Sequence, residues 1–131
     1  MTTGKPNVVY ILDDDESVRN ALSRLLRSAH VEVRAYGSAD EFLEDIRNIP
    51  NGCILMDLTM PQMNGCQVMK TLEDKGIRLP VIALSASDVD ESRRDAKQRG
   101  AVMFLRKPVD DRALLDAIKW ATSNGNLTAK D

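Results

Sequence analysis

Short apolar runs alternate with stretches of helical periodicity along almost the whole chain, and this alternation restricts the fold more than any other feature. The runs are about four to six residues long and lie at residues 8–12, 31–35, 52–56, 81–84 and 102–105. Such runs, separated by amphipathic helices, are typical of βα units on a parallel sheet that helices cover on both faces. We therefore predict an α/β fold with five strands and five helices in three layers, doubly wound.

The predicted helices differ in how strongly the pattern supports them. The first places apolar residues on one face, with Ser23 and several arginines opposite; those apolar residues are Val18, Ala21, Leu22, Leu25, Leu26 and Ala29. Asp15 can cap its start, and Ser38 with Glu41 forms the capping signature of the second. The segment 88–99 is mostly charged, so we predict an exposed, marginal helix there.

Length and charge exclude several classes of protein. The 131 residues fit one domain, and the net charge of −2 provides no general attraction to nucleic acid or to anionic membranes. No apolar stretch approaches the roughly 18 residues that span a bilayer, and the N-terminus lacks a signal-peptide pattern, so we expect a cytoplasmic location. We expect an N-terminal extension over residues 1–6, one domain over 7–121, and a mobile polar tail or the start of a linker over 122–131.

The cysteine and histidine content argues against a zinc site. Cys53 and Cys66 are the only cysteines, His30 is the only histidine, and no Cys-x-x-Cys spacing occurs. In a reducing compartment both cysteines should be free thiols. A redox role for Cys66, close in sequence to Asp57, is disfavoured.

Polar side chains follow four of the five apolar runs. Asp13, Asp14 and Asp15 follow the first, Asp57 ends the third, Ser85 follows the fourth and Lys107 comes soon after the fifth. In open α/β sheets, ligands bind at the carboxyl ends of the strands. The sequence thus places carboxylates, a hydroxyl and an ammonium at one edge of the predicted sheet.

The carboxylates indicate a site for a divalent cation. The three consecutive acids alone are explained by capping of the next helix. If the first and third strands are neighbours, however, their tips lie about 5 Å apart and bring Asp13, Asp14 and Asp57 together. Like charges at that range repel by about 1–4 kcal/mol per pair, unless a cation fills the pocket or a carboxyl group stays protonated. Mg²⁺ prefers such oxygen ligands.

Ser85 and Lys107 extend the site toward phosphoryl transfer. Each residue alone has an ordinary structural explanation, as a strand-closing serine or a surface lysine. Phosphoryl transfer requires an in-line nucleophile and neutralisation of charge on the phosphoryl oxygens. A carboxylate can be that nucleophile and form an acyl phosphate.

These motifs, in this order, resemble the receiver domains of two-component response regulators. The resemblance covers about residues 7–121 and rests on Asp13-Asp14, Asp57 with Met60-Pro61 and Gly65 after it, Ser85-Ala86, and Lys107-Pro108. It implies a flavodoxin-like receiver fold with strand order 2-1-3-4-5. The segments 13–19 and 36–43 are most similar to receivers that precede a LuxR-type helix-turn-helix output domain.

The resemblance implies a phosphorylation site and a metal site. Asp57 would accept a phosphoryl group from a sensor histidine kinase or a phosphotransfer protein. Asp14, Asp57 and the backbone carbonyl of Thr59 would bind Mg²⁺, for which Mn²⁺ can substitute, and Asp13 would act largely through water. The family is not a class of turnover enzymes in the usual sense, since a receiver catalyses its own phosphorylation and dephosphorylation.

Other positions would contact or regulate the phosphoryl group. Its oxygens would be contacted by Ser85, Ala86 and Lys107, and movement of Ser85 would be coupled to Phe104 at the family's switch position. Thr59 and Ser87 match two variable positions that tune the lifetime of the phosphorylated form. Neither is an acid or an amide that would orient a hydrolytic water, so we expect a phosphorylated form that is not especially short-lived; a half-life of seconds at neutral pH would contradict this.

The resemblance also implies an output face on the fourth helix, fifth strand and fifth helix, near residues 88–99 and 110–121. Its partner would be an output domain or another protein, with a phosphorylation-dependent homodimer as a further option, and neither nucleic acid nor membrane would bind directly. Candidate contact residues are Arg93, Arg94, Asp95, Lys97 and Trp120. The alternative is a solvated helix face with a partly buried Trp.

Other functions match the sequence less well. An aspartyl-phosphate hydrolase of the haloacid-dehalogenase kind would have a second acid two residues after Asp57, where this chain has Thr59, and a cap domain for which the chain has no room. Glycine-rich nucleotide-binding motifs are absent. A degenerate receiver that acts as a scaffold remains an alternative. The sequence also leaves open whether the receiver stands alone or belongs to a longer transcription regulator.

Overall fold

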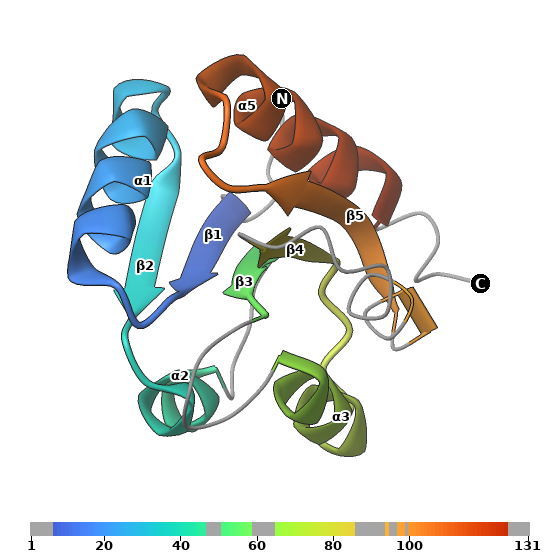
Figure 1. Ribbon diagram of the computed structural model, residues 1–131. Coiled ribbons are helices and arrows are strands. Elements are labelled where there is room, and N and C mark those ends of the chain that lie inside the picture. The colour runs from blue at the N-terminus through green and yellow to red at the C-terminus, as the bar shows by residue number, and fades with distance from the viewer. Residues whose placement is uncertain are drawn as a thin grey trace.

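The computed structural model describes residues 7–46, 51–58, 65–85, 94, 97–98 and 100–125. It contains one five-stranded parallel sheet of order β2-β1-β3-β4-β5, with helices on both faces (Figure 1). The elements in chain order are β1 (Asn7–Leu12), α1 (Glu16–Ser28), β2 (Glu32–Tyr36), α2 (Ala39–Asp45), β3 (Asn51–Asp57), α3 (Gly65–Asp74), β4 (Val81–Ser85), β5 (Ala101–Arg106), α5 (Asp111–Trp120) and a π-helical turn, η1 (Ala121–Gly125). The predicted fold class and strand order are confirmed.

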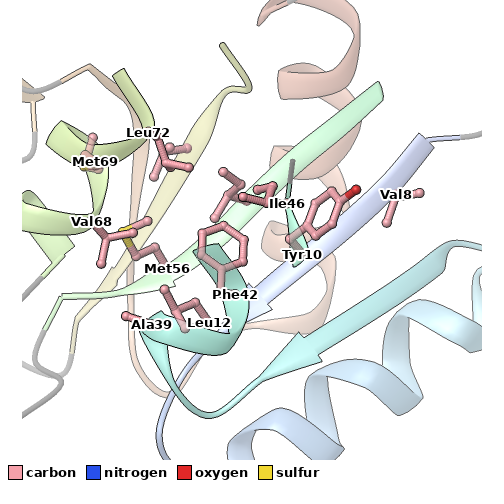
Figure 2. Close-up of a cluster of buried hydrophobic side chains, with 12 residues drawn as sticks. Val8, Tyr10, Leu12, Ala39, Phe42, Ile46, Met56, Val68, Met69 and Leu72 are labelled. Atoms are coloured by element: carbon pink, nitrogen blue, oxygen red, sulfur yellow. The ribbon is translucent and has the colours of Figure 1, made fainter. Parts of the chain in front are cut away.

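The sheet separates two apolar cores, because successive strand residues point to opposite faces. One core joins the sheet to α1 and α5 and is built from Val9, Ile11, Cys53, Leu55, Ile82, Leu84, Leu22, Leu26, Leu114, Ala117, Ile118 and Ala121. The other joins it to α2 and α3, and the alternate strand residues Val8, Tyr10 and Leu12 face Phe42 and Val68 there (Figure 2). Phe42 makes edge contacts with Tyr10 and Tyr36. The inner strands β1, β3 and β4 are therefore apolar on both faces, and their buried carboxylates and hydroxyl lie at the carboxyl ends, at Asp13, Asp57 and Ser85.

Three details of the sequence prediction are wrong. The buried face of α1 runs along Leu22, Ser23 and Leu26, while Ala21 and Ala29 are exposed. Since successive residues on a helix are about 100° apart, a stripe centred between Leu22 and Ser23 excludes Ala21. Strand β2 lies one residue later than predicted.

The third correction concerns the C-terminal segment, which we expected to lack regular structure from Thr122. As far as Gly125 it is helical. The Thr122 hydroxyl donates to the carbonyls of Ile118 and Lys119, and the Ser123 hydroxyl donates to Lys119. These side-chain bonds supply partners for carbonyls at the end of α5.

Most of the segment 88–99 lies outside the described residues, so its helix stays a prediction, as do the contacts expected from Arg93 and Asp95. The described positions 94, 97 and 98 within it are helical. Among the described residues, no helix combines the length and apolar character that crossing a membrane requires.

Among the described strand residues, Gly52 is the one at which the backbone of a neighbouring strand excludes any side chain. It pairs with Val8 at the start of β3 with φ +144°, and a Cβ there would lie 1.8 Å from the Val8 carbonyl oxygen. We expect Gly52→Ala to lower the free energy of unfolding by about 2–3 kcal/mol, because β1 and β3 must separate and the backbone is strained. Urea unfolding followed by circular dichroism measures this.

Gly76→Ala is the matched control for this prediction. Gly76 also has a positive φ, +75°, but a Cβ there would meet nothing within 4 Å. Gly76→Ala should lower the free energy of unfolding by only about 1–2 kcal/mol, because the left-handed backbone conformation is its one source of strain. Equal losses for the two variants would show that the contact with Val8 contributes nothing.

Candidate functional site

The acids meet because of the register between β1 and β3. Leu12 pairs with Met56 across the two parallel strands. Asp13 and Asp57, one residue later on each strand, therefore leave the sheet side by side. This is the juxtaposition that the sequence predicted on condition that the two strands were neighbours.

The hydroxyl and the ammonium come from the next two strands. Asp57 pairs with Leu84 on β4, so Ser85 follows at the same edge. Ser85 in turn pairs with Arg106 on β5, and the backbone N–H of Lys107 donates to the Ser85 carbonyl at 2.8 Å. Four parallel strands thus deliver one functional group each to a single edge of the sheet.

Asp13, Asp14 and Asp57 form a compact carboxylate cluster. One carboxylate oxygen from each lies within 4.8 Å of those from the other two. Asp13 and Asp57 are buried, at 0% and 2% exposure, whereas Asp14 is exposed. Solvent therefore reaches the cluster at Asp14, whereas the carboxylates of Asp13 and Asp57 are buried.

Lys107 connects the cluster to β5. Its Nζ lies 2.7 Å from Asp13 Oδ2 and 3.4 Å from Asp57 Oδ2, and its side chain is 18% exposed. Burial alone would lower the pKa of this ammonium, but the hydrogen bond to Asp13 and the charges of Asp57 and Asp13 outweigh it and raise the pKa above its ordinary value. Lys107 is therefore a fixed cation at neutral pH.

Hydrogen bonds hold Asp13 at four atoms. Its Oδ1 accepts from the backbone N–H of Asp15 at 2.9 Å, and its Oδ2 accepts from Lys107. Its backbone N–H donates to the Tyr36 carbonyl at 3.1 Å, and its carbonyl accepts from Arg19 Nη1 at 2.8 Å. Asp13 is thus fixed in side chain and backbone, in contrast to the exposed Asp14.

The three consecutive acids divide their roles. Asp15 caps α1, accepting from the Ser17 hydroxyl at 2.7 Å and from the backbone N–H groups of Ser17 and Val18. The Ser17 hydroxyl is the main cause of a lowered Asp15 pKa, followed by the Val18 N–H. Capping therefore explains Asp15 but not Asp13 and Asp14, which face the cluster.

The remaining predicted site residues lie partly within and partly outside the described residues. Ser85 is buried, with 1% exposure, and Phe104 is half-buried and packs against Leu58 and Ala83. Thr59, Ala86 and Ser87 lie outside the described residues. Their predicted contacts stay predictions.

Sequence reasoning missed Arg19, which it treated as one arginine of a polar helix face. Nothing in the helical period separates Arg19 from the other arginines of α1. The only sequence feature related to the position of Arg19 is the glycine at residue 37, where a Cβ would lie 2.7 Å from Arg19 Nη1. The glycine leaves room for the guanidinium beside Asp13.

The donor set fits a small hard cation. Bonds of about 2.0–2.1 Å in octahedral geometry place neighbouring oxygen ligands roughly 3 Å apart and opposite ones roughly 4 Å apart. The 4.8 Å spread of the cluster approaches this range. Lys107 contributes one positive charge against three carboxyl groups, so electrostatics also favour a second cation.

Comparison with protein families supplies independent information. The sequence profile described as "Response regulator receiver domain" matches residues 9–119. The transcriptional regulatory protein TdiR of Thauera aromatica is 37% identical over 119 residues, which make up 91% of this chain and 52% of TdiR. The transcriptional regulatory protein FixJ of Rhizobium meliloti is 33% identical over 116 residues, or 88% of this chain and 57% of FixJ. The chain spans about half the length of the curated relatives that it matches.

Solved structures agree with the sequence matches. The crystal structure of FixJ-N superposes with a TM-score of 0.85 at 32% identity, over 91% of this chain and 95% of that one. The response regulator StyR superposes with a TM-score of 0.86 at 35% identity, over 96% of this chain and 64% of StyR. The fold is thus that of proteins similar in sequence.

Proposed function

The chain belongs to the response regulator receiver domain family of two-component phosphorelay signalling, and from this premise we propose that Asp57 accepts a phosphoryl group in a Mg²⁺-dependent reaction. The donor is a phosphohistidine on a sensor histidine kinase or a phosphotransfer protein. The observation that carries the proposal is the contact of Lys107 with Asp13 and Asp57 beside the exposed Asp14.

The chemistry follows from the charges at the strand tips. An Asp57 oxygen forms a bond to phosphorus while the phosphorus–nitrogen bond of the donor breaks, and its electron pair leaves with the imidazole. Lys107, held within 3.4 Å of the nucleophilic carboxylate, neutralises charge that develops on the phosphoryl oxygens. Ser85 adds a neutral donor at the same edge. The chain thereby catalyses its own phosphorylation, and the same site, with water as nucleophile, its dephosphorylation.

Asp14 and Asp57, with the carbonyl of Thr59, are the proposed direct ligands of Mg²⁺. Asp13 would act through water, which agrees with the engagement of its two carboxylate oxygens by Asp15 and Lys107. When bound, Mg²⁺ supplies positive charge to the phosphoryl oxygens and lowers the repulsion among the carboxylates. Mn²⁺, with the same preference for oxygen, can replace it.

Phosphorylation would act on an output face formed by the fourth helix, β5 and α5. Phe104 lies on β5, next to the strand that ends in Ser85, and a shift of the Ser85 hydroxyl toward the phosphoryl group would let the ring move. Among the described residues, the large apolar side chains exposed on β5 and α5 are Val102 and Trp120, at 37% and 45%. The occupant is an output domain, a partner protein or a second copy of this chain.

The proposed division of the chain is a receiver over residues 7–121, flanked by an extension at 1–6 and a tail or linker segment at 122–131. The curated relatives are about twice as long, and TdiR and FixJ are named transcriptional regulatory proteins. We therefore propose that this receiver controls a transcriptional output domain. The cytoplasmic location and a phosphorylated form that is not especially short-lived stay predictions.

Incubation with acetyl phosphate tests the proposal directly. We expect intact-mass analysis to show one phosphoryl adduct with Mg²⁺ and none when EDTA is added, because the carboxylate cluster repels the phosphodonor until a cation is bound. Hydroxylamine should remove the adduct, as it does an acyl phosphate. Absence of an adduct with acetyl phosphate and with a panel of phosphorylated histidine kinases would favour the scaffold function instead.

A further inference from the structure

Arg19 crosses from α1 to the turn after β2 and to the tip of β1. Its Nη1 donates to the Asp13 carbonyl at 2.8 Å, and a Cβ on Gly37 would lie only 2.7 Å from the same nitrogen. The guanidinium therefore occupies a space that exists because residue 37 has no side chain.

The Asp13 carbonyl belongs to the peptide plane that joins Asp13 to Asp14. A donor bound to this carbonyl fixes the plane from which both carboxylates project. The opposite side of Asp13 is tied down as well, since its backbone N–H donates to the Tyr36 carbonyl, one residue before Gly37. The turn after β2 and the side chain of Arg19 thus hold the tip of β1 between them.

We propose that Arg19 is a positioning residue for the divalent cation: it orients the Asp13–Asp14 peptide so that the acid cluster is preorganised, and Gly37 provides the space it needs. This rests on the proposed Mg²⁺-dependent function. Arg19 does not touch the cation or the phosphoryl group. Because Arg19 fixes the two carboxylates before the ion binds, less conformational entropy is lost on binding and the affinity is higher.

The sign of its effect separates positioning from simple electrostatics. Arg19 is a cation close to a cation site, so its charge alone opposes Mg²⁺ binding, and removing that charge would tighten the binding. Loss of positioning would instead weaken Mg²⁺ binding. Mutation of residues that hold metal ligands in place typically lowers the metal affinity by about 10–100-fold. We expect Arg19→Gln to raise the dissociation constant for Mg²⁺ by about 10-fold.

Isothermal titration calorimetry with Mg²⁺, on chains verified as folded, provides a readout that does not depend on phosphorylation. Gly37→Ala should also raise the dissociation constant, because the new methyl group displaces the guanidinium. The double variant should bind no more weakly than Arg19→Gln alone, since both changes remove one interaction. Arg24→Gln, an exposed arginine on the same helix, should leave the value unchanged.

Phosphorylation kinetics give a second, independent readout. In Arg19→Gln the Mg²⁺ concentration for half-maximal adduct formation should rise with the dissociation constant, while the rate at saturating Mg²⁺ returns to that of the native chain. Unchanged or tighter Mg²⁺ binding in Arg19→Gln would overturn the positioning role and leave the proposed function intact. No Mg²⁺ binding by the native chain would overturn both.

Discussion

Replacing Asp57 by Asn is expected to abolish the phosphoryl adduct without unfolding the chain. The amide matches the carboxylate in shape, so the buried pocket at the tip of β3 can retain its packing, but a neutral amide oxygen does not form a stable bond to phosphorus. The free energy of unfolding should stay level or rise, because one of three clustered carboxylates is removed. Intact-mass analysis with acetyl phosphate and Mg²⁺, together with a thermal unfolding curve, measures both effects.

Asp116→Asn is the matched control, because Asp116 is an exposed carboxylate on α5 that does not belong to the carboxylate cluster. It should become phosphorylated like the native chain. If Asp57→Asn still acquired one phosphoryl group at the native rate, the acceptor would be another residue. The exposed Asp14 would then be the first to examine, by mass mapping of the modified peptide.

The fold was predictable because the strands and helices of each layer have a characteristic hydrophobic pattern in the local sequence. A strand covered on both faces is an uninterrupted apolar run, as in β4, where all five residues are buried. The amphipathic helices between the runs then require crossovers on both faces of a parallel sheet. The strand order itself came from the resemblance to receivers, since local pattern does not specify which strands are neighbours.

The site was predictable to the extent that it depends on strand ends. Asp13, Asp57 and Lys107 each follow an apolar run, so the sheet topology alone brings them together. Arg19 could not be found this way, because its partner is a backbone carbonyl and its space depends on Gly37. Such contacts depend on how the turns after β1 and β2 approach each other, which cannot be deduced from the helical periodicity of α1.

The same limit explains the error on α1. Periodicity counted the apolar Ala21 as buried and the polar Ser23 as exposed. The helix is in fact rotated toward Ser23, which brings Arg19 over the turn that contains Gly37. The rotation is thus coupled to the contact between Arg19 and Asp13, a long-range constraint with no counterpart in the local pattern.

Lys107→Met is expected to slow phosphorylation by about 10²–10³-fold at saturating Mg²⁺, the range seen when one preorganised stabilising group is lost. Methionine keeps much of the length and apolar stem of the side chain but carries no charge. The variant leaves Asp13 Oδ2 without the ammonium now 2.7 Å away, so the metal-free chain should also unfold more easily, by about 1–3 kcal/mol. Quench-flow mass analysis and urea unfolding measure the two quantities.

In Lys107→Met the affinity for Mg²⁺ should rise although the phosphorylation rate falls. Lys107 lies against one oxygen of Asp13 and one of Asp57, so it competes with the ion for the same negative charge. Its removal should tighten Mg²⁺ binding, and added Mg²⁺ should recover part of the lost stability because the ion binds only the folded chain. Lys75→Met, an exposed lysine after α3, should change none of these values.

This opposition makes the role of Lys107 testable against general damage to the site. A distorted pocket would lose metal affinity and rate together, whereas loss of a charge that acts on the phosphoryl oxygens lowers the rate alone. A native rate of phosphorylation in Lys107→Met would contradict the role assigned to the ammonium. The contacts with Asp13 and Asp57 would then serve only to balance buried carboxylates until the metal ion arrives.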